Sequence, residues 1–249
     1  MTMANEKIYI HELIDVIGHN RARYMHHMTA NWCPVGRAER NQRCFGVWAT
    51  VGSTGAWPQV VNLWELDGWD GLAANFEHEL VGRGAQDPSL AEWWTVAADL
   101  RRGGVDRIVV PEPWSPTIDE LTGAGVKGTV YAHELVTVPV GRSRAFLRAL
   151  EVSGRSALEA FGLRCVGAFR VAMSTDTEAV VIWAAPSLSA WADFERGWDD
   201  GSIAPWRAAL DSLEASVHRT LMVDAPLSPM RIGRQPDVHD RLPLSDVGP

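Results

Sequence analysis

Apolar and polar positions follow two periods along this chain, and the alternation of those periods predicts the order of its elements. Residues 7–16 are rich in Ile, Val and Tyr, which is typical of a strand. The following residues place Tyr24, Met25 and Met28 at helical spacing. Continued along the chain, the pattern predicts strand, helix, strand, strand, helix and strand at 7–16, 18–31, 43–51, 58–66, 69–100 and 105–111. It predicts the same order again at 129–138, 141–160, 164–173, 178–184, 188–215 and 217–223.

Glycines and prolines mark the interruptions in this pattern. Gly82, Gly84 and Pro88 fall inside the long helix predicted at 69–100 and favour a kink or a loop there. The segment 113–128, with its prolines and glycines, is expected to link the two halves.

The predicted domains are therefore residues 1–112 and 129–225. The tail, 226–249, holds several prolines and many charges. It is expected to be loose, or to form an arm that needs a partner surface to order it.

The two halves also repeat each other in sequence. IYIHELIDV at 8–16 returns as VYAHELVTV at 130–138, and RCFGVWATVG at 43–52 returns as RCVGAFRVAM at 164–173. VDRIVVPEPWSP, which starts at residue 105, returns as VHRTLMVDAPLSP. Since the order is kept and the period is far too long for a solenoid, each half is expected to be a small domain of a covalent pseudo-dimer.

The order βαββαβ is that of the ferredoxin-like fold, whose sheet carries helices on one face only. A second copy is the natural cover for the other face. The predicted fold is thus α+β, with two tandem ferredoxin-like domains that form a pseudo-dimeric α/β barrel, whose interior can hold a ligand.

Composition narrows the classes of partner. The 249 residues are 46% apolar and 22% charged, as in a globular protein, and the net charge is −8. This acidic balance argues against nucleic acid and anionic lipid as partners. No apolar run approaches the roughly 20 residues of a membrane span. The first residues lack the apolar core of a signal peptide, and the three cysteines fit a reducing compartment, so a cytoplasmic protein is expected.

The first strand of each half carries the most informative candidates. Strand parity places Glu12 on a face that is otherwise apolar, and Glu134 stands at the same place in the second half. A lone carboxylate on such a face is costly unless it is paired or neutral. If the face lines a cavity, the pKa of the glutamate is raised and it can move a proton. If the face packs under helices, each glutamate needs a buried partner such as an arginine.

Histidines form the second group of candidates. His11 and His133 repeat in the two halves, which favours a structural role, although imidazole is also the usual general base. The first half adds His19, His26 and His27, and later His78. No metal-ligand spacing or nucleotide motif accompanies them, so no cofactor is predicted, while a haem or a metal ion held by a histidine of the first half stays open.

Part of the chain resembles a known family. GVWATVGSTGAWPQVVNLWEL at 46–66 is similar to the Gly-x-Trp…Val-Val-x-Leu-Trp pattern of NIPSNAP-type proteins, in the dimeric α/β-barrel superfamily. HEL at 11–13 and at 133–135 resembles the opening Tyr-Glu-Leu-Arg strand of that family. His11 and His133 stand where the family often has Tyr, and Asn62 where a His is common. The superfamily implied by this resemblance includes cofactor-free monooxygenases, isomerases, polyketide cyclases and haem enzymes, so the fold does not choose a reaction.

The leading hypothesis is an isomerase, lyase, cyclase or cofactor-free monooxygenase that acts by proton transfer on a small apolar or aromatic molecule. Glu12 or His11 would be the acid/base. The residues expected to bind the substrate are Trp48, Trp64, Asn62, Tyr24, Glu134 and His133. A haem or metal enzyme and a non-catalytic binding or assembly protein are the alternatives, and a homodimer of the whole chain stays open.

Overall fold

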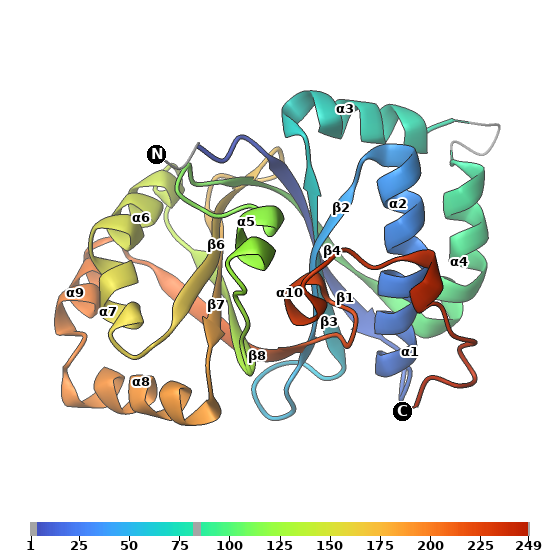
Figure 1. Ribbon diagram of the computed structural model, residues 1–249. Helices are drawn as coiled ribbons and strands as arrows, with labels where there is room; N and C mark the ends of the chain where they lie inside the picture. The colour runs from blue at the N-terminus through green and yellow to red at the C-terminus, as the bar shows by residue number, and fades with distance from the viewer. Residues whose placement is uncertain (1–3, 82–85, 249) are drawn as a thin grey trace.

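Eight antiparallel strands form a closed barrel with helices outside it (Figure 1). The computed structural model describes residues 4–81 and 86–248. The strands are β1 Ile8–Val16, β2 Arg43–Thr50, β3 Gln59–Leu66, β4 Arg101–Pro111, β5 Val130–Thr137, β6 Arg164–Ala172, β7 Glu178–Ala185 and β8 Ser216–Asp224. Around the barrel they run in the order β1-β3-β2-β8-β5-β7-β6-β4. The chain is therefore a mixed α/β protein with an eight-stranded antiparallel sheet.

The two halves have the same connectivity. Within the barrel, β4-β1-β3-β2 come from the first half and β8-β5-β7-β6 from the second. The halves join where β2 pairs with β8 and where β4 pairs with β6. Each half even carries the same irregularity, a register shift between Cys44 and Gly46 on β2 and between Cys165 and Gly167 on β6. All eight predicted strands are present, although β4 begins at Arg101 rather than at residue 105.

The helices are more broken than the pattern predicted. They are α1 Arg21–His26, η1 His27–Trp32, α2 Cys33–Arg40, α3 Gly68–Glu79, α4 Pro88–Leu100, α5 Ile118–Gly123, α6 Ser143–Ala149, η2 Leu150–Gly154, α7 Arg155–Glu159, α8 Leu188–Asp200, α9 Ala204–Ser212, α10 Pro229–Ile232 and η3 Val238–Asp240. None of the described helices has both the length and the apolar character needed to cross a membrane.

The interruption expected inside the helix predicted at 69–100 is confirmed, because Asp87 caps a new helix that has Pro88 at its first position. Gly82 and Gly84 lie outside the described residues. The single helix predicted at 188–215 is wrong. It ends at Gly201, which adopts a left-handed conformation with φ 85°.

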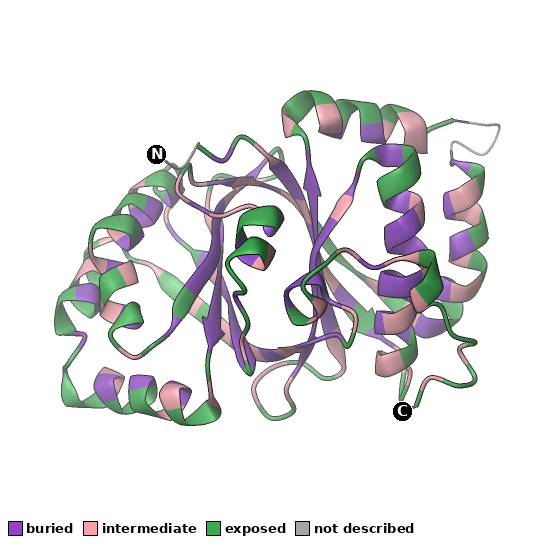
Figure 2. Ribbon diagram, viewed as in Figure 1, coloured by how far each residue is buried: buried purple, intermediate pink, exposed green. Residues whose placement is uncertain are grey.

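Side chains fill the interior of the barrel, and much of the ribbon of its strands is coloured as buried (Figure 2). Tyr9, Phe45 and Phe169 are fully buried there, and their rings meet edge to face with centroids 5.0 to 6.3 Å apart. Aliphatic residues such as Leu63 and Ile182 complete this cluster. An eight-stranded barrel is just wide enough for side chains to fill it. The expected ligand cavity between the sheets is therefore replaced by packed core in this part of the barrel.

Each half sends its last segment across the other half. After β4, Ser115 Oγ accepts from Ala168 N of β6 at 2.9 Å. After β8, Ser228 Oγ accepts from Val47 N of β2 at 3.3 Å. The tail then continues over the first half, where Gln235 bonds both backbone groups of Cys44. The tail thus packs on the first half of this chain.

Candidate functional site

A cavity of about 400 Å³ lies between the outer face of β1, β3 and β4 and helices α2, α3 and α4. Its apolar wall includes several large rings, and six charged residues also line it. The rings are Trp32, Trp64, Phe76, Trp93 and Trp94. The charged residues are Glu12, Arg40, Glu79, Arg101, Asp106 and Arg107. Small-molecule sites have this size and this mixture of apolar wall with a few polar groups.

Glu12 is held in the cavity wall by two donors from the neighbouring strand. Asn62 lies directly opposite Glu12 in the β1–β3 register, and Trp64 lies opposite Ile10. Asn62 Nδ2 and Trp64 Nε1 each donate to Glu12 Oε2 at 2.9 Å. The other oxygen, Oε1, accepts no hydrogen bond from the described residues, and Glu12 lines the cavity. One oxygen is thus anchored, while the other is free to meet a ligand.

A second carboxyl group stands beside Glu12 on its other side. Asp106 of β4 is the register partner of Glu12, so the two side chains leave the sheet on the same face. Burial, followed by the charge of Asp106, raises the pKa of Glu12 above its ordinary value. Burial also raises the pKa of Asp106, although Arg101 and Arg107 act against it. Two neighbouring carboxyl groups with raised pKa values at the edge of a cavity are suited to proton transfer.

Glu134 has a different environment in the second half. Its Oε1 accepts from Arg219 Nε at 2.7 Å and from Nη2 at 2.6 Å, while Trp183 Nε1 donates to Oε2 at 3.1 Å. The Arg219 guanidinium also lies over the rings of Trp191 and Phe194. Of the two environments left open by the sequence, Glu12 therefore occupies the cavity wall and Glu134 the buried ion pair.

The predicted histidines lie elsewhere, inside the barrel. His11 Nε2 and His133 Nε2 are 2.8 Å apart, and the two rings stack. Burial lowers the pKa of His11, and it lowers the pKa of His133 to about 4. Because these side chains point to the opposite face of the sheet from Glu12, they do not reach the cavity.

Of the remaining predicted site residues, some lie at the cavity and one lies inside the barrel. Trp64 lines the cavity. Asn62 stands behind Glu12 and donates to Tyr24 Oη at 3.0 Å as well, so Tyr24 of helix α1 supports the site. Trp48 packs inside the barrel against Tyr131, which places it away from the cavity.

Asp106 and Arg101 were not identified from the sequence. Matching VDR at 105–107 with VHR at 217–219 by letter aligns Arg107 with Arg219. The strand registers instead place Asp106 opposite Glu12 and Arg219 opposite Glu134. SP at 115–116 matches SP at 228–229 with a spacing that is one residue longer than the spacing between VDR and VHR. This longer spacing aligns Asp106 with Arg219, and it was the useful signal in the sequence.

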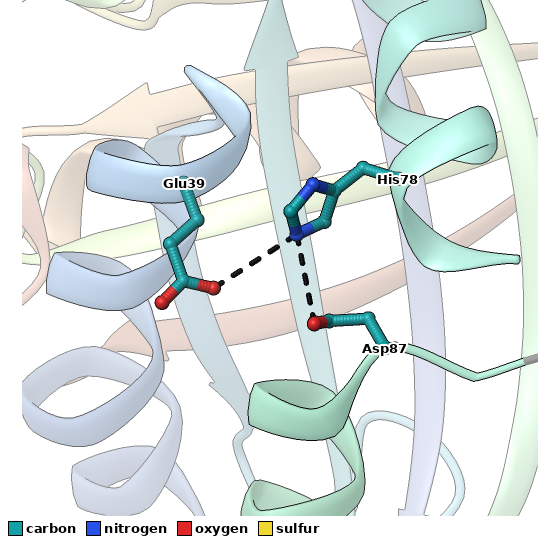
Figure 3. A group of neighbouring side chains, drawn as sticks. All are labelled: Glu39, His78 and Asp87. Atoms are coloured by element: carbon teal, nitrogen blue, oxygen red, sulfur yellow. Dashed lines mark ion pairs between the residues drawn. The ribbon is translucent and has the colours of Figure 1, made fainter. Parts of the chain in front are cut away.

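A second group of possible ligand side chains lies at the junction of α2, α3 and α4. His78 stands between Glu39 and Asp87, and the three ligand atoms lie within 4.8 Å of one another (Figure 3). Asp87 already accepts from the backbone N–H groups of Ser89 and Leu90 and pairs with the buried Arg40. Because that guanidinium opposes a cation, the group fits a helix cap with ion pairs better than a metal centre.

The geometry also bears on a haem held by a histidine of the first half. None of the four extra histidines is among the described residues that line the cavity. His27 uses both ring nitrogens, with Trp93 O at 3.1 Å and Asn31 Nδ2 at 2.9 Å. His26 Nε2 accepts from Leu242 N at 3.1 Å. The cavity beside Glu12 therefore offers no imidazole for an axial bond among the residues described.

Comparison with known proteins supports the fold. No protein-family model matches the chain, and no curated protein matches it in sequence. A candidate monooxygenase from Lactobacillus acidophilus is 8% identical, with 89% of this chain and 95% of that chain covered and a TM-score of 0.57. A haem-binding protein from Thermus thermophilus is 10% identical over 90% of this chain and 92% of that chain, with a TM-score of 0.50.

A NIPSNAP-like domain protein from Burkholderia xenovorans also matches. It is 20% identical, with 45% of this chain and 90% of that chain covered and a TM-score of 0.37. At these identities the comparisons show a shared fold with the first two proteins, and the NIPSNAP resemblance is not confirmed as a family assignment.

Proposed function

We propose that this protein is an enzyme that moves a proton on a small, apolar or aromatic molecule bound beside Glu12. The observation that supports this most directly is the environment of that carboxyl group. One oxygen is fixed by Asn62 and Trp64, and the other is unbonded among the described residues at the wall of a cavity. A base needs this combination of fixed orientation and access to the substrate.

The chemistry would begin with Glu12 Oε1 taking a proton from a carbon next to a carbonyl group. Asp106, which has a raised pKa, would hold or return a proton on the same face. Loss of such a proton is the first step shared by isomerisation, elimination, cyclisation and oxygenation without a cofactor. The candidate monooxygenase of similar fold supports this class of reaction. We also interpret the fold as two tandem ferredoxin-like units that form a pseudo-dimer.

Two other functions are less well supported. A haem enzyme finds some support in the haem-binding protein of similar fold, but the cavity beside Glu12 supplies no histidine among its described lining residues. An absorption spectrum of the protein loaded with haem would show a Soret shift if an axial ligand forms. A purely structural role does not explain why the carboxyl group of Glu12 lies at the cavity without an ion-pair partner among the described residues.

Exchange of carbon-bound hydrogen for deuterium tests the proposal. 2-Tetralone, an aromatic ketone with acidic C–H bonds, is incubated with the protein in D₂O and followed by proton NMR. The wild type should accelerate exchange over buffer. Glu12→Gln, which is nearly isosteric, should lower the rate by about 100-fold or more while the melting temperature stays near that of the wild type, since general base catalysis contributes about that much.

Glu134→Gln serves as the matched control, because Glu134 lies in an ion pair away from the cavity. It should lower the melting temperature and leave the exchange rate of the folded protein nearly unchanged. Exchange no faster than buffer with the wild type, or equal rates for the wild type and Glu12→Gln, would refute the proposal.

A further inference from the structure

One irregularity in β4 decides which arginine faces the cavity. In the β1–β4 register Ile14 pairs with Gly104 and Asp15 with Gly103, but Val16 pairs with Arg101. Arg102 is therefore an extra residue, as in a β-bulge. Without it, alternation would turn Arg102 toward the helices and Arg101 away from them. The pairing of β5 with β8 in the second half runs without such a shift.

Glycine makes this irregularity possible. A Cβ at Gly104 would lie 2.3 Å from Leu13 O, which no side chain tolerates. Gly103 has φ 150°, a conformation that other residues rarely adopt. The bulge thus rests on two adjacent glycines, and its outcome is a guanidinium on the same face as Glu12 and Asp106.

The surroundings of Arg101 differ from those of the other two arginines in the cavity wall. Arg40 pairs with Asp87, and Arg107 Nε pairs with Glu178 Oε2 at 2.7 Å. Within the described part of the chain, Arg101 forms no ion pair, and its buried Nε has no hydrogen-bond partner. Its guanidinium lies over the Trp94 ring, with the central carbon 4.9 Å from the ring centroid.

We infer that Arg101 and Trp94 bind a substrate that carries an anionic oxygen on an aromatic framework, such as an aromatic carboxylate or phenolate. The unpaired guanidinium supplies charge-assisted hydrogen bonds to the oxygen. Trp64, Trp93 and Trp94 supply apolar contact for the ring. This inference rests on the proposed function, since it names the substrate class of the same cavity.

The charges nearby decide how strongly such a ligand binds. Glu12 and Asp106 face the same space and repel an anion when they are ionised, while Arg107 is already neutralised by Glu178. Arg101 is therefore the group on which the preference for an anion depends. Removing the charge of Glu12 should tighten the binding of an anion.

Isothermal titration with two probes of nearly equal shape tests this inference. 2-Naphthoate carries the anionic oxygen, and 2-naphthamide is its neutral counterpart. The wild type should bind 2-naphthoate about tenfold or more tightly than 2-naphthamide, as expected for one charge-assisted contact. Arg101→Gln should abolish that preference. Arg102→Gln is the matched control, since Arg102 is the exposed neighbour with the same charge, and it should keep the preference.

The results separate this inference from the proposed function. Equal affinity for the two probes in the wild type, or a preference that survives Arg101→Gln in a variant that melts like the wild type, overturns the role of Arg101. Glu12→Gln should bind 2-naphthoate at least as tightly as the wild type and still fail in deuterium exchange. If exchange is normal in Glu12→Gln while the naphthoate preference depends on Arg101, the proposed chemistry fails and the anion site stands.

Discussion

Glu12 and Glu134 occupy the same position in two halves of one fold, yet only one of them is neutralised. Both accept from the indole N–H of a tryptophan on the next strand. In the second half the other neighbouring strand supplies Arg219, whose guanidinium bonds Glu134 and lies over three aromatic rings. In the first half that strand supplies Asp106, which is short and of the same charge as Glu12.

Two halves with the same strand connectivity can therefore keep one buried carboxyl group in an ion pair and place the matching carboxyl group at a cavity. A buried glutamate that has an arginine on one oxygen and an indole N–H on the other is a satisfied structural element. The same glutamate opposite an aspartate keeps a proton at higher pH and leaves space beside it. Asp106, in the place of Arg219, leaves Glu12 without the arginine that neutralises Glu134.

Removal of Arg219 should have the largest effect. Arg219→Met leaves Glu134 buried without its partner, and breaking a buried ion pair costs about 3–5 kcal/mol. For a chain of this size we expect a fall in melting temperature of about 6–20 °C, measured by circular dichroism. The Glu134→Gln/Arg219→Met double variant should regain much of the loss. A single variant that melts within a degree of the wild type would show that the pair is not structural.

The comparison can also be reversed by building the second-half pair into the first. Asp106→Arg places a guanidinium opposite Glu12, where it should pair with Oε1 and fill the cavity. We expect deuterium exchange from 2-tetralone to fall about 100-fold or more, while the melting temperature does not fall. Asp106→Asn, which removes the charge without adding bulk, is the control and should retain more activity. Full exchange activity in Asp106→Arg would mean that the cavity is not the site.

The two halves remain alike at His11 and His133 inside the barrel. From the pKa values of these histidines we expect the stability of the protein to depend on pH. Their pKa values are lowered by burial, to about 4 for His133, whereas an unfolded histidine titrates near pH 6.5. Between about pH 6.5 and 4 the unfolded chain therefore binds protons that the folded chain does not. The stabilisation is fully present above about pH 6.5 and is lost as the pH falls toward 4.

Urea unfolding at several pH values measures this loss. His133→Gln removes one titrating group from the pair, so its free energy of unfolding should fall less steeply over the same pH range. A slope equal to that of the wild type would show that the pair does not control acid stability.

The smallest effect concerns the tail. Gln235 accepts from Cys44 N at 3.0 Å and donates to Cys44 O at 2.8 Å. Among the described residues, only the first half receives such a contact. Gln235→Ala should cost about 1 kcal/mol and lower the melting temperature by about 2–4 °C. Arg234→Ala, at an exposed ion pair with Asp240, is the control and should change it far less. An equal loss in both variants would mean that the tail binds without this contact.

The sequence predicted the strands well because their alternation is local, whereas the site depends on registers that are not. Glu12 could be placed on an apolar strand face from its neighbours alone. Which face meets a cavity, and whether Asp106 or Arg107 stands beside Glu12, depends on how β1 pairs with β4. The bulge at Arg102 adds one residue to that pairing, and no periodicity within the segment shows it.

The crossing of the tail has a consequence for how the protein is made. The ribosome synthesises the chain from its N-terminus. All four strands of the first half therefore emerge before β8, the strand that pairs with β2. β2 pairs with β8 through Trp48–Thr50 and Met222–Asp224. Gln235, which bonds the backbone of Cys44, is synthesised later still. Until then the nascent chain carries an unpaired strand edge, which is a template for association between chains. The chain should therefore be more prone to aggregation before the last strand leaves the ribosome than after it.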